Sequence, residues 1–212
     1  SLNLTHTDID ESTGVDLPSA LVEKKIGIGT KFPVPFVDSD RYFMGVDVFP
    51  SINTDDYDGS SSAFRIPFRT YLIYKESDDF LVVAGVWIRP GYKDEVLPLL
   101  GFNYKANDRL SFNIASDDPN ITYKLNEKTS ALLEFDYKNE EYEATEAANE
   151  GKVIRNKYYT MGVGLKHQFC ENFSASASVG GAFNRKIEFV DDSGKIVPEN
   201  GIYASLSMNA RF

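Results

Sequence analysis

The chain has 212 residues and a formal net charge of −10, and none of its apolar runs approaches the length of a membrane-spanning helix. The acidic balance argues against nucleic acid as a partner, because no basic stripe is available for phosphates. The single cysteine, Cys170, excludes a disulfide framework and a cysteine-based metal site.

The first segment, "SLNLTHTDID" (1–10), has neither a starting Met nor a signal peptide, and we interpret it as a processed N-terminus. Five polar turns then follow, each opened by a ring residue. They are FVDSDRY (36–42), YKESDDF (74–80), YKANDRL (104–110), YKLNEKT (123–129) and HQFCENF (167–173). Their Asp, Asn, Ser and Glu residues favour tight turns, and the flanking segments alternate apolar and polar residues. Each turn therefore predicts an antiparallel hairpin.

Two strands per turn give ten strands, and the alternating C-terminal segment "GIYASLSMNARF" (201–212) gives an eleventh. A strand near residues 2–10 makes twelve. The segment 109–125 predicts two strands shorter than the ~9–11 residues of a membrane strand, so ten is the alternative count. We expect one domain over residues 1–212.

Longer hydrophilic connections are predicted between the hairpins, at 50–63, 138–157 and 184–200. Short turns that alternate with longer loops are typical of outer-membrane proteins. The predicted fold class is therefore all-β, a closed antiparallel up-and-down transmembrane-type β-barrel with its apolar face outward. The alternative is a soluble barrel or sandwich with that face inward.

The apolar face ends in ring residues beside the turns, which predicts an interfacial aromatic girdle. Its predicted members are Phe36, Tyr42, Tyr74, Phe80, Tyr104, Tyr123, Phe173 and Phe212. The terminal Phe, on the same face as the other rings, indicates a last strand that closes the barrel.

Charged residues recur on the opposite parity and are predicted to face a lumen. They are Lys31, Asp47, Arg65, Arg69, Arg109, Glu134, Asp136, Lys166 and Arg211. They would either fill a narrow lumen as ion-pair networks or line a wet channel that favours anionic solutes. We expect Arg65 or Arg69 to lie within ion-pair reach of an inward carboxylate, with Asp47 the first candidate.

No catalytic, cofactor or metal motif is predicted. The two histidines, His6 and His167, belong to no recognisable hydrolase arrangement. The carboxylates of "TDDYDGS" (54–60) fit a calcium loop poorly and are interpreted as a solvated acidic loop.

The stretches "LPLLGFNYKANDRLSFNI", "PNITYKLNEKTSALLEFDYKNEEYEA" and "YYTMGVGLKHQFCENFSASASVGGAF" are strand-and-turn patterns. From about residue 20 onward the chain resembles an uncharacterised family of bacterial outer-membrane β-barrel proteins, the domain of unknown function family 6268. The resemblance implies the barrel fold and brings no catalytic residues.

The predicted location is the outer membrane of a Gram-negative bacterium. The expected partners are outer-membrane lipid, the barrel-assembly machinery through the C-terminal strand, and a small solute, with no nucleic acid. The leading hypothesis for function is passage or binding of that solute through a charged lumen. The alternatives are a closed structural or interaction barrel with acidic extracellular loops and, less favoured, a lipid-modifying barrel enzyme.

Overall fold

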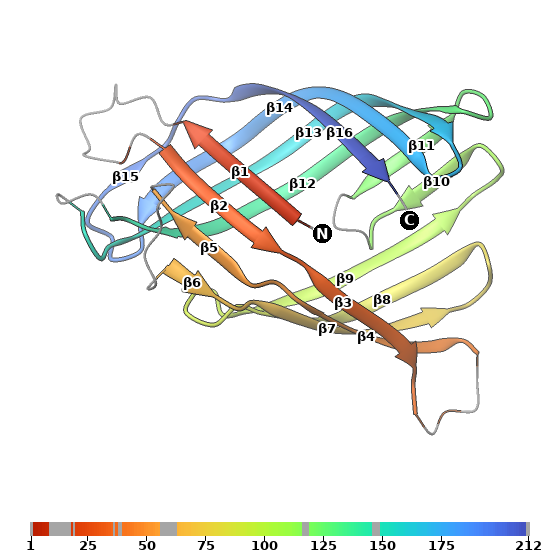
Figure 1. The fold of residues 1–212 in the computed structure, drawn as a ribbon, viewed down its shortest axis with the longest axis horizontal. Coiled ribbons are helices and arrows are strands. Elements are labelled where there is room, and N and C mark those ends of the chain that lie inside the picture. The colour runs from red at the N-terminus through yellow and green to blue at the C-terminus, as the bar shows by residue number, and fades with distance from the viewer. Residues whose placement is uncertain are drawn as a thin grey trace.

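The fold is one large, strongly curved β-sheet (Figure 1). The computed structural model describes residues 2–8, 18, 20–35, 37, 40–55, 63–115, 119–145 and 149–210. No helix in this part of the chain is long and apolar enough to cross a bilayer. The strands are β1 (Leu2–Asp8), β2 (Ala20–Ile26), β3 (Ile28–Pro33), β4 (Tyr42–Val48), β5 (Ser51–Thr54), β6 (Phe64–Arg65), β7 (Phe68–Lys75), β8 (Phe80–Ile88), β9 (Val96–Lys105), β10 (Leu110–Asn113), β11 (Asn120–Lys124), β12 (Thr129–Glu143), β13 (Val153–Cys170), β14 (Phe173–Phe189), β15 (Lys195–Ile196) and β16 (Gly201–Ala210).

Apart from one parallel bridge between Thr54 of β5 and Glu143 of β12, the strands follow one another through the sheet in chain order. Four pairs of consecutive elements each continue one path across the sheet. β2 and β3 pair with β5 and β4, which in turn pair with β6 and β7, and β15 and β16 both pair with β14. The sixteen described elements therefore form twelve successive runs. All five predicted hairpins are confirmed. β1 pairs with β2, and the strands predicted within 109–125 are present and short.

The five hairpin turns lie at one end of the sheet, here called the turn end, and the opposite end is the loop end. Two of the connections predicted at the loop end are shorter than expected. β12 continues to Glu143, β13 begins at Val153 and β14 continues to Phe189, so much of 138–157 and 184–200 is strand. The charged residues of these segments pair across the strands, which stabilises strand structure in a hydrophilic sequence.

The sheet is not closed. Among the described residues, β1 pairs only with β2, and β16 pairs only with β14, which leaves a seam between the first and last strands. Figure 1 shows the two strands pointing in opposite directions on the same side of the molecule. The all-β antiparallel class is thus confirmed, while closure of the sheet is not observed.

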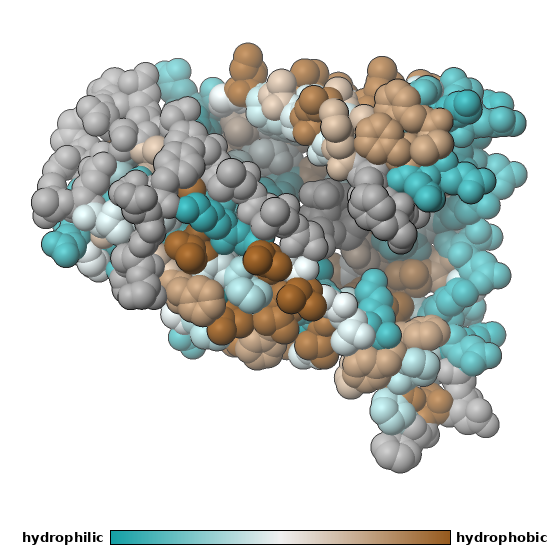
Figure 2. Space-filling view, in the orientation of Figure 1, coloured by the Kyte–Doolittle hydropathy of each residue, from teal (hydrophilic) through white to brown (hydrophobic). Residues whose placement is uncertain are grey.

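The apolar parity of the strands faces outward, as the alternation predicts. Leu100, Val163 and Leu206 are 78%, 59% and 71% exposed. Figure 2 shows apolar side chains scattered over the outer surface of the sheet. The same exposed set includes Ile28, Leu72, Val96, Met161, Leu165, Val179, Ile202 and Met208.

The buried apolar core lies at the loop end and depends on a β-bulge in β14. Lys157 pairs with Lys186 but Tyr159 pairs with Phe183, so two residues of β14 face one of β13. Asn184 at this bulge has a φ of 52°, which an Asn tolerates better than most residues. The extra residue reverses the parity of β14, and its next apolar residues turn inward. They join a cluster of Leu21, Tyr142, Ala144, Ile154, Ile187, Phe189 and Ile196.

Glycines let a tyrosine ring lie flat against the inner wall. A Cβ placed on Gly162 would come within 2.3 Å of the Tyr203 Oη, and one on Gly180 within 2.7 Å of its Cε1. Tyr203 is the register partner of Gly180, which in turn pairs with Gly162. The ring therefore crosses two strands where side chains are missing.

We predict that Gly180→Val destabilises the fold by about 1–3 kcal/mol, because the new side chain overpacks Tyr203 and the neighbouring backbone. Equilibrium unfolding in urea, followed by the fluorescence of Trp87, measures the change. The control is Gly201→Ala, since a Cβ there meets only Arg185 Nη1, at 3.4 Å. Equal losses in the two variants would contradict this packing.

Candidate functional site

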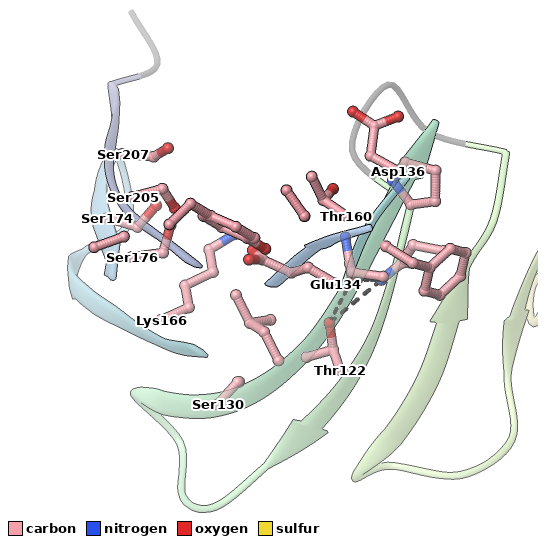
Figure 3. Close-up of a pocket in the computed structure, with 18 of the residues that line it drawn as sticks. Thr122, Ser130, Glu134, Asp136, Thr160, Lys166, Ser174, Ser176, Ser205 and Ser207 are labelled. Atoms are coloured by element: carbon pink, nitrogen blue, oxygen red, sulfur yellow. Dashed lines mark hydrogen bonds between the residues drawn. The ribbon is translucent and has the colours of Figure 1, made fainter. Parts of the chain in front are cut away.

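A polar cavity of about 1130 Å³ lies on the inner face of β10 to β14 and β16 (Figure 3). Its wall combines hydroxyl, amide and charged side chains. It reaches the turn end, where Glu127 and Glu171 of two hairpin turns line it. Its polar lining residues include Thr7 of β1, Asn113, Asn120, Thr122, Lys124, Ser130, Glu134, Asp136, Lys138, Lys166, Ser174, Ser176, Tyr203, Ser205 and Ser207.

The strand register arranges these side chains in rows across the wall. One row near the turn end, which contains two exposed lysines of the cavity wall, runs Lys124, Ser130, Lys166, Ser176 and Ser207 on successive strands. The next row lies two residues further from the turn end on each strand and runs Thr122, Leu132, Gly164, Ser178 and Ser205. Residues two apart on a strand share a face, so both rows lie on the inner face of the sheet, and all their members except Gly164 and Ser178 line the cavity.

Some polar groups of the cavity satisfy one another. The Lys138 Nζ lies 2.7 Å from an Asp136 carboxylate oxygen, and the hydroxyls of Ser178 and Ser205 lie 2.6 Å apart. Near β10, the Asn113 amide donates to Asn120 Oδ1 at 2.9 Å. These contacts leave other charged groups of the wall to face the open space.

The predicted lumen charges occupy several different places. Glu134, Asp136 and Lys166 line the cavity. The expected ion pair is present on neighbouring strands, with Arg69 Nε 2.5 Å from Asp47 Oδ2.

Three of the remaining predicted charges, Arg65, Lys31 and Arg109, do not line this cavity. The Arg65 guanidinium lies 5.1 Å from the centre of the Tyr92 ring. Lys31 is exposed on β3, and Arg109 is exposed at the end of a hairpin turn. Arg211 lies outside the described residues.

The described girdle residues lie on the outer face beside the hairpin turns. Tyr42 and Tyr74 are neighbours with ring centres 5.1 Å apart, and Phe80 and Tyr104 are neighbours at 5.8 Å. Tyr123 and Phe173 are exposed on the same face, while Phe36 and Phe212 lie outside the described residues.

A second row of rings lies toward the loop end and was missed from the sequence. Tyr137 and Tyr159 are register partners with ring centres 4.8 Å apart, and Phe183 is the next partner on β14. The sequence places these rings on the outward parity, but no turn motif lies near them, so periodicity alone marks them only as apolar strand residues.

The loop end is held by an ion-pair cluster, defined here as the buried residues Arg89, Tyr92, Glu141 and Arg155 together with the half-exposed Asp94. Arg155 Nη2 lies 2.7 Å from Glu141 Oε1, and the side chains are 4% and 1% exposed. Both Glu141 carboxylate oxygens also accept the backbone N–H of Lys93, at 3.1 Å. The cluster thereby ties the loop between β8 and β9 to β12 and β13.

Arg89 completes this connection. Its Nη1 donates to the carbonyl of Asn139 at 2.6 Å, and its guanidinium lies 4.5 Å from the centre of the Tyr92 ring. Burial, reinforced by the charge of Glu140, raises the pKa of the Tyr92 phenol well above its ordinary value.

Asp94 remains ionised in this cluster. Burial alone would raise the pKa of Asp94, but a hydrogen bond from Asn139 and the charges of Arg155 and Lys157 lower it below its ordinary value of 3.8.

The acidic segment 54–60 is only partly described, and its first carboxylate corrects the prediction of a solvated loop. Asp55 is 8% exposed and accepts hydrogen bonds from the backbone N–H of Thr145 at 2.9 Å and from its hydroxyl at 2.5 Å. This docking of the β5 end onto the β12 end uses the carboxylate, while Asp56 and Asp58 lie outside the described residues.

In the described part of the chain, no group of three His, Cys, Asp or Glu side chains is placed to hold a metal ion. His167 is exposed, and its Nδ1 lies 3.0 Å from the Thr129 hydroxyl. The side chain of His6 lies outside the described part. The cavity therefore offers hydrogen bonds and single charges as its chemistry.

The model of a family described as a domain of unknown function, DUF6268, matches residues 39–212. The chain belongs to this family. The match begins at residue 39, whereas the resemblance described from the sequence begins at about residue 20. All strands of the cavity wall except β1 lie within the DUF6268 domain. Searches of the curated proteins and of the solved structures each returned no match.

We predict that Arg155→Met destabilises this DUF6268 protein by about 3–5 kcal/mol, because Glu141 would stay buried without its partner charge. Urea unfolding measures the loss, and adding Glu141→Leu should recover part of it. The control is Lys75→Met, which breaks the exposed Lys75–Asp78 pair of 2.6 Å and should cost less than about 1 kcal/mol. Similar losses for the two pairs would argue against the cluster's role at the loop end.

Proposed function

We propose that this protein is a β-barrel of a bacterial outer membrane whose inner cavity binds a small polar solute. The observation that carries the proposal is the inverted distribution of polarity, with exposed large apolar side chains outside and a polar cavity inside. A soluble protein rarely exposes a wide apolar surface, because contact with water opposes it. A bilayer reverses that preference.

The dimensions of the apolar band support a membrane environment. On β14, Phe173 and Phe183 mark the two rows of rings and lie ten residues apart. Ten steps of about 3.3 Å along a strand tilted by about 40° give a height of about 25 Å. This equals the apolar band of outer-membrane barrels, which aromatic rows flank on both sides.

A bilayer also demands a closed sheet, since an open edge would leave backbone groups without hydrogen bonds in the hydrocarbon. Pairing of β1 with β16 would meet that demand. The proposal is supported by Thr7 of β1, which lines the same cavity as Tyr203, Ser205 and Ser207 of β16. The opposite directions of the two strands in Figure 1 suit an antiparallel pair.

Binding is favoured over free passage because packed side chains fill the interior at the loop end. The apolar cluster around Ile154 and the ion-pair cluster around Arg155 lie there, while the cavity reaches the turn end. In an outer membrane with short turns on the periplasmic side, the solute would enter from the periplasm. The cavity has no recognisable catalytic arrangement, so the proposed role is binding without chemistry.

We predict that Val163→Arg prevents stable insertion, because an Arg facing lipid near mid-membrane costs about 2–4 kcal/mol. Folding into phospholipid vesicles, scored by resistance to added protease, measures insertion. The matched control is Leu125→Arg, since Leu125 is 52% exposed but lies in a hairpin turn, whereas Val163 is 59% exposed in the band. Equal tolerance of both variants would favour a soluble protein.

We predict a disulfide across the seam in a Cys170→Ser background. Thr7→Cys is combined in turn with Tyr203→Cys, Ser205→Cys and Ser207→Cys, and one pair should cross-link in vesicles because paired strands bring Cα atoms to about 4.4–6.8 Å. Thr7→Cys with Ser176→Cys, whose position is on β14 behind β16, is the control. Failure of all three test pairs in inserted protein would contradict closure through β1 and β16.

A further inference from the structure

Two charges of opposite sign in the cavity lack ion-pair partners among the described residues. Lys166 makes no ion pair there, and neither does Glu134, whereas the nearby Asp136 is paired with Lys138. Figure 3 shows the Lys166 and Glu134 side chains pointing toward one another across the cavity. The two side chains therefore face the same part of the cavity without forming an ion pair with each other.

The strand register sets the length of that space. Glu134 pairs with Gly162, which lies four residues from Lys166 on β13, so the two backbones are about 13 Å apart along the strand. Glycine at the intervening inward position, Gly164, leaves no side chain between the two charges on this strand. The two side chains extend into this span from opposite ends, so a small solute with a group for each charge would lie between or beside their tips within the cavity of about 1130 Å³.

Hydrogen-bonding groups surround both ends of the gap. Ser130 and Ser176 are the register neighbours of Lys166, and Ser207 follows in the same row. At the other end, the Tyr203 ring crosses Gly180 and Gly162, which brings its hydroxyl to the position beside Glu134. Hydroxyls donate to a bound carboxylate at one end, and a carboxylate and a phenol oxygen accept from a bound ammonium at the other.

We propose that the cavity binds a small zwitterion of the α-amino acid type, with its carboxylate at Lys166 and its ammonium at Glu134. This inference rests on the proposed solute-binding function and names its ligand class. A simple anion would leave Glu134 uncompensated and repelled by the ligand, and a simple cation would do the same to Lys166. Only a ligand with both charges satisfies both ends.

The test is calorimetric titration of the vesicle-inserted or micelle-folded protein with four probes of similar size. L-Serine carries both charges, glycolate only the carboxylate, ethanolamine only the ammonium, and ethylene glycol neither. L-Serine should bind at least about tenfold more tightly than each of the others, since hydrogen bonds to charged groups are worth more than neutral ones. A preference for any other probe, or no preference, overturns the inference.

Variants assign the two ends. Lys166→Gln should weaken L-serine binding at least about tenfold and leave ethanolamine binding no weaker, while Glu134→Gln should weaken L-serine equally and leave glycolate no weaker. Lys166→Arg and Glu134→Asp keep the charges and should retain most of the affinity, which separates loss of charge from loss of fold. Arg109→Gln and Asp108→Asn, exposed charges of a hairpin turn that do not line the cavity, are controls and should change affinity by less than about twofold.

The outcomes distinguish this inference from the function beneath it. Inserted protein that binds ethylene glycol as tightly as L-serine contradicts the zwitterion site and leaves solute binding intact. Inserted protein that binds none of the four probes, or protein that does not insert, contradicts the proposed function together with the site. L-Serine binding that survives both Lys166→Gln and Glu134→Gln also overturns the inference.

Discussion

The two-residue period of the β-strand is the constraint on which the rest of this structure depends. Because successive side chains point to opposite faces, one residue of slippage would exchange the apolar outside for the polar inside along a whole strand. The chain keeps one parity across hairpin after hairpin, so the rows of Lys166, Ser176 and Ser207 line up on the inner wall while Val163 and Leu206 stay outside. The cavity is thus a product of register held over many strands.

At the loop end this alternation is interrupted once, by the β-bulge in β14, and the bulge directs apolar side chains into the interior. The bulge at Asn184 reverses the parity of β14, so Ile187 and Phe189 enter the interior instead of extending the outer apolar surface. The interior there holds a buried apolar cluster, and beside it the Arg155–Glu141 pair is buried and hydrogen-bonded. A single inserted residue therefore separates a wet cavity from a packed end within the same sheet.

Sequence reasoning could predict the hairpins, the outward parity and the Asp47–Arg69 pair, because each depends on local turns or neighbouring strands. It could not predict the loop end. The segments around Glu141 and Arg155 are as hydrophilic as loops, and only pairing across β12 and β13 makes them strands. Asp55 likewise resembled a solvated carboxylate until Thr145, ninety residues later, supplied its hydrogen bonds. Contacts distant in sequence leave no periodic signal.

A packed end and an open end divide stability from function in this sheet. The dense hydrogen bonding around Glu141 fixes the far halves of β12 and β13, and the same strands carry Glu134 and Lys166 into the cavity. Among the described residues Glu134 and Lys166 make no ion pair, so they contribute little to folding and are available to the proposed ligand. The strands gain their rigidity at the loop end, which lets the wall near the turn end keep glycines and unpaired charges. Positioning by a rigid end is what allows a hollow, hydrated wall to present Glu134 and Lys166 at a constant spacing.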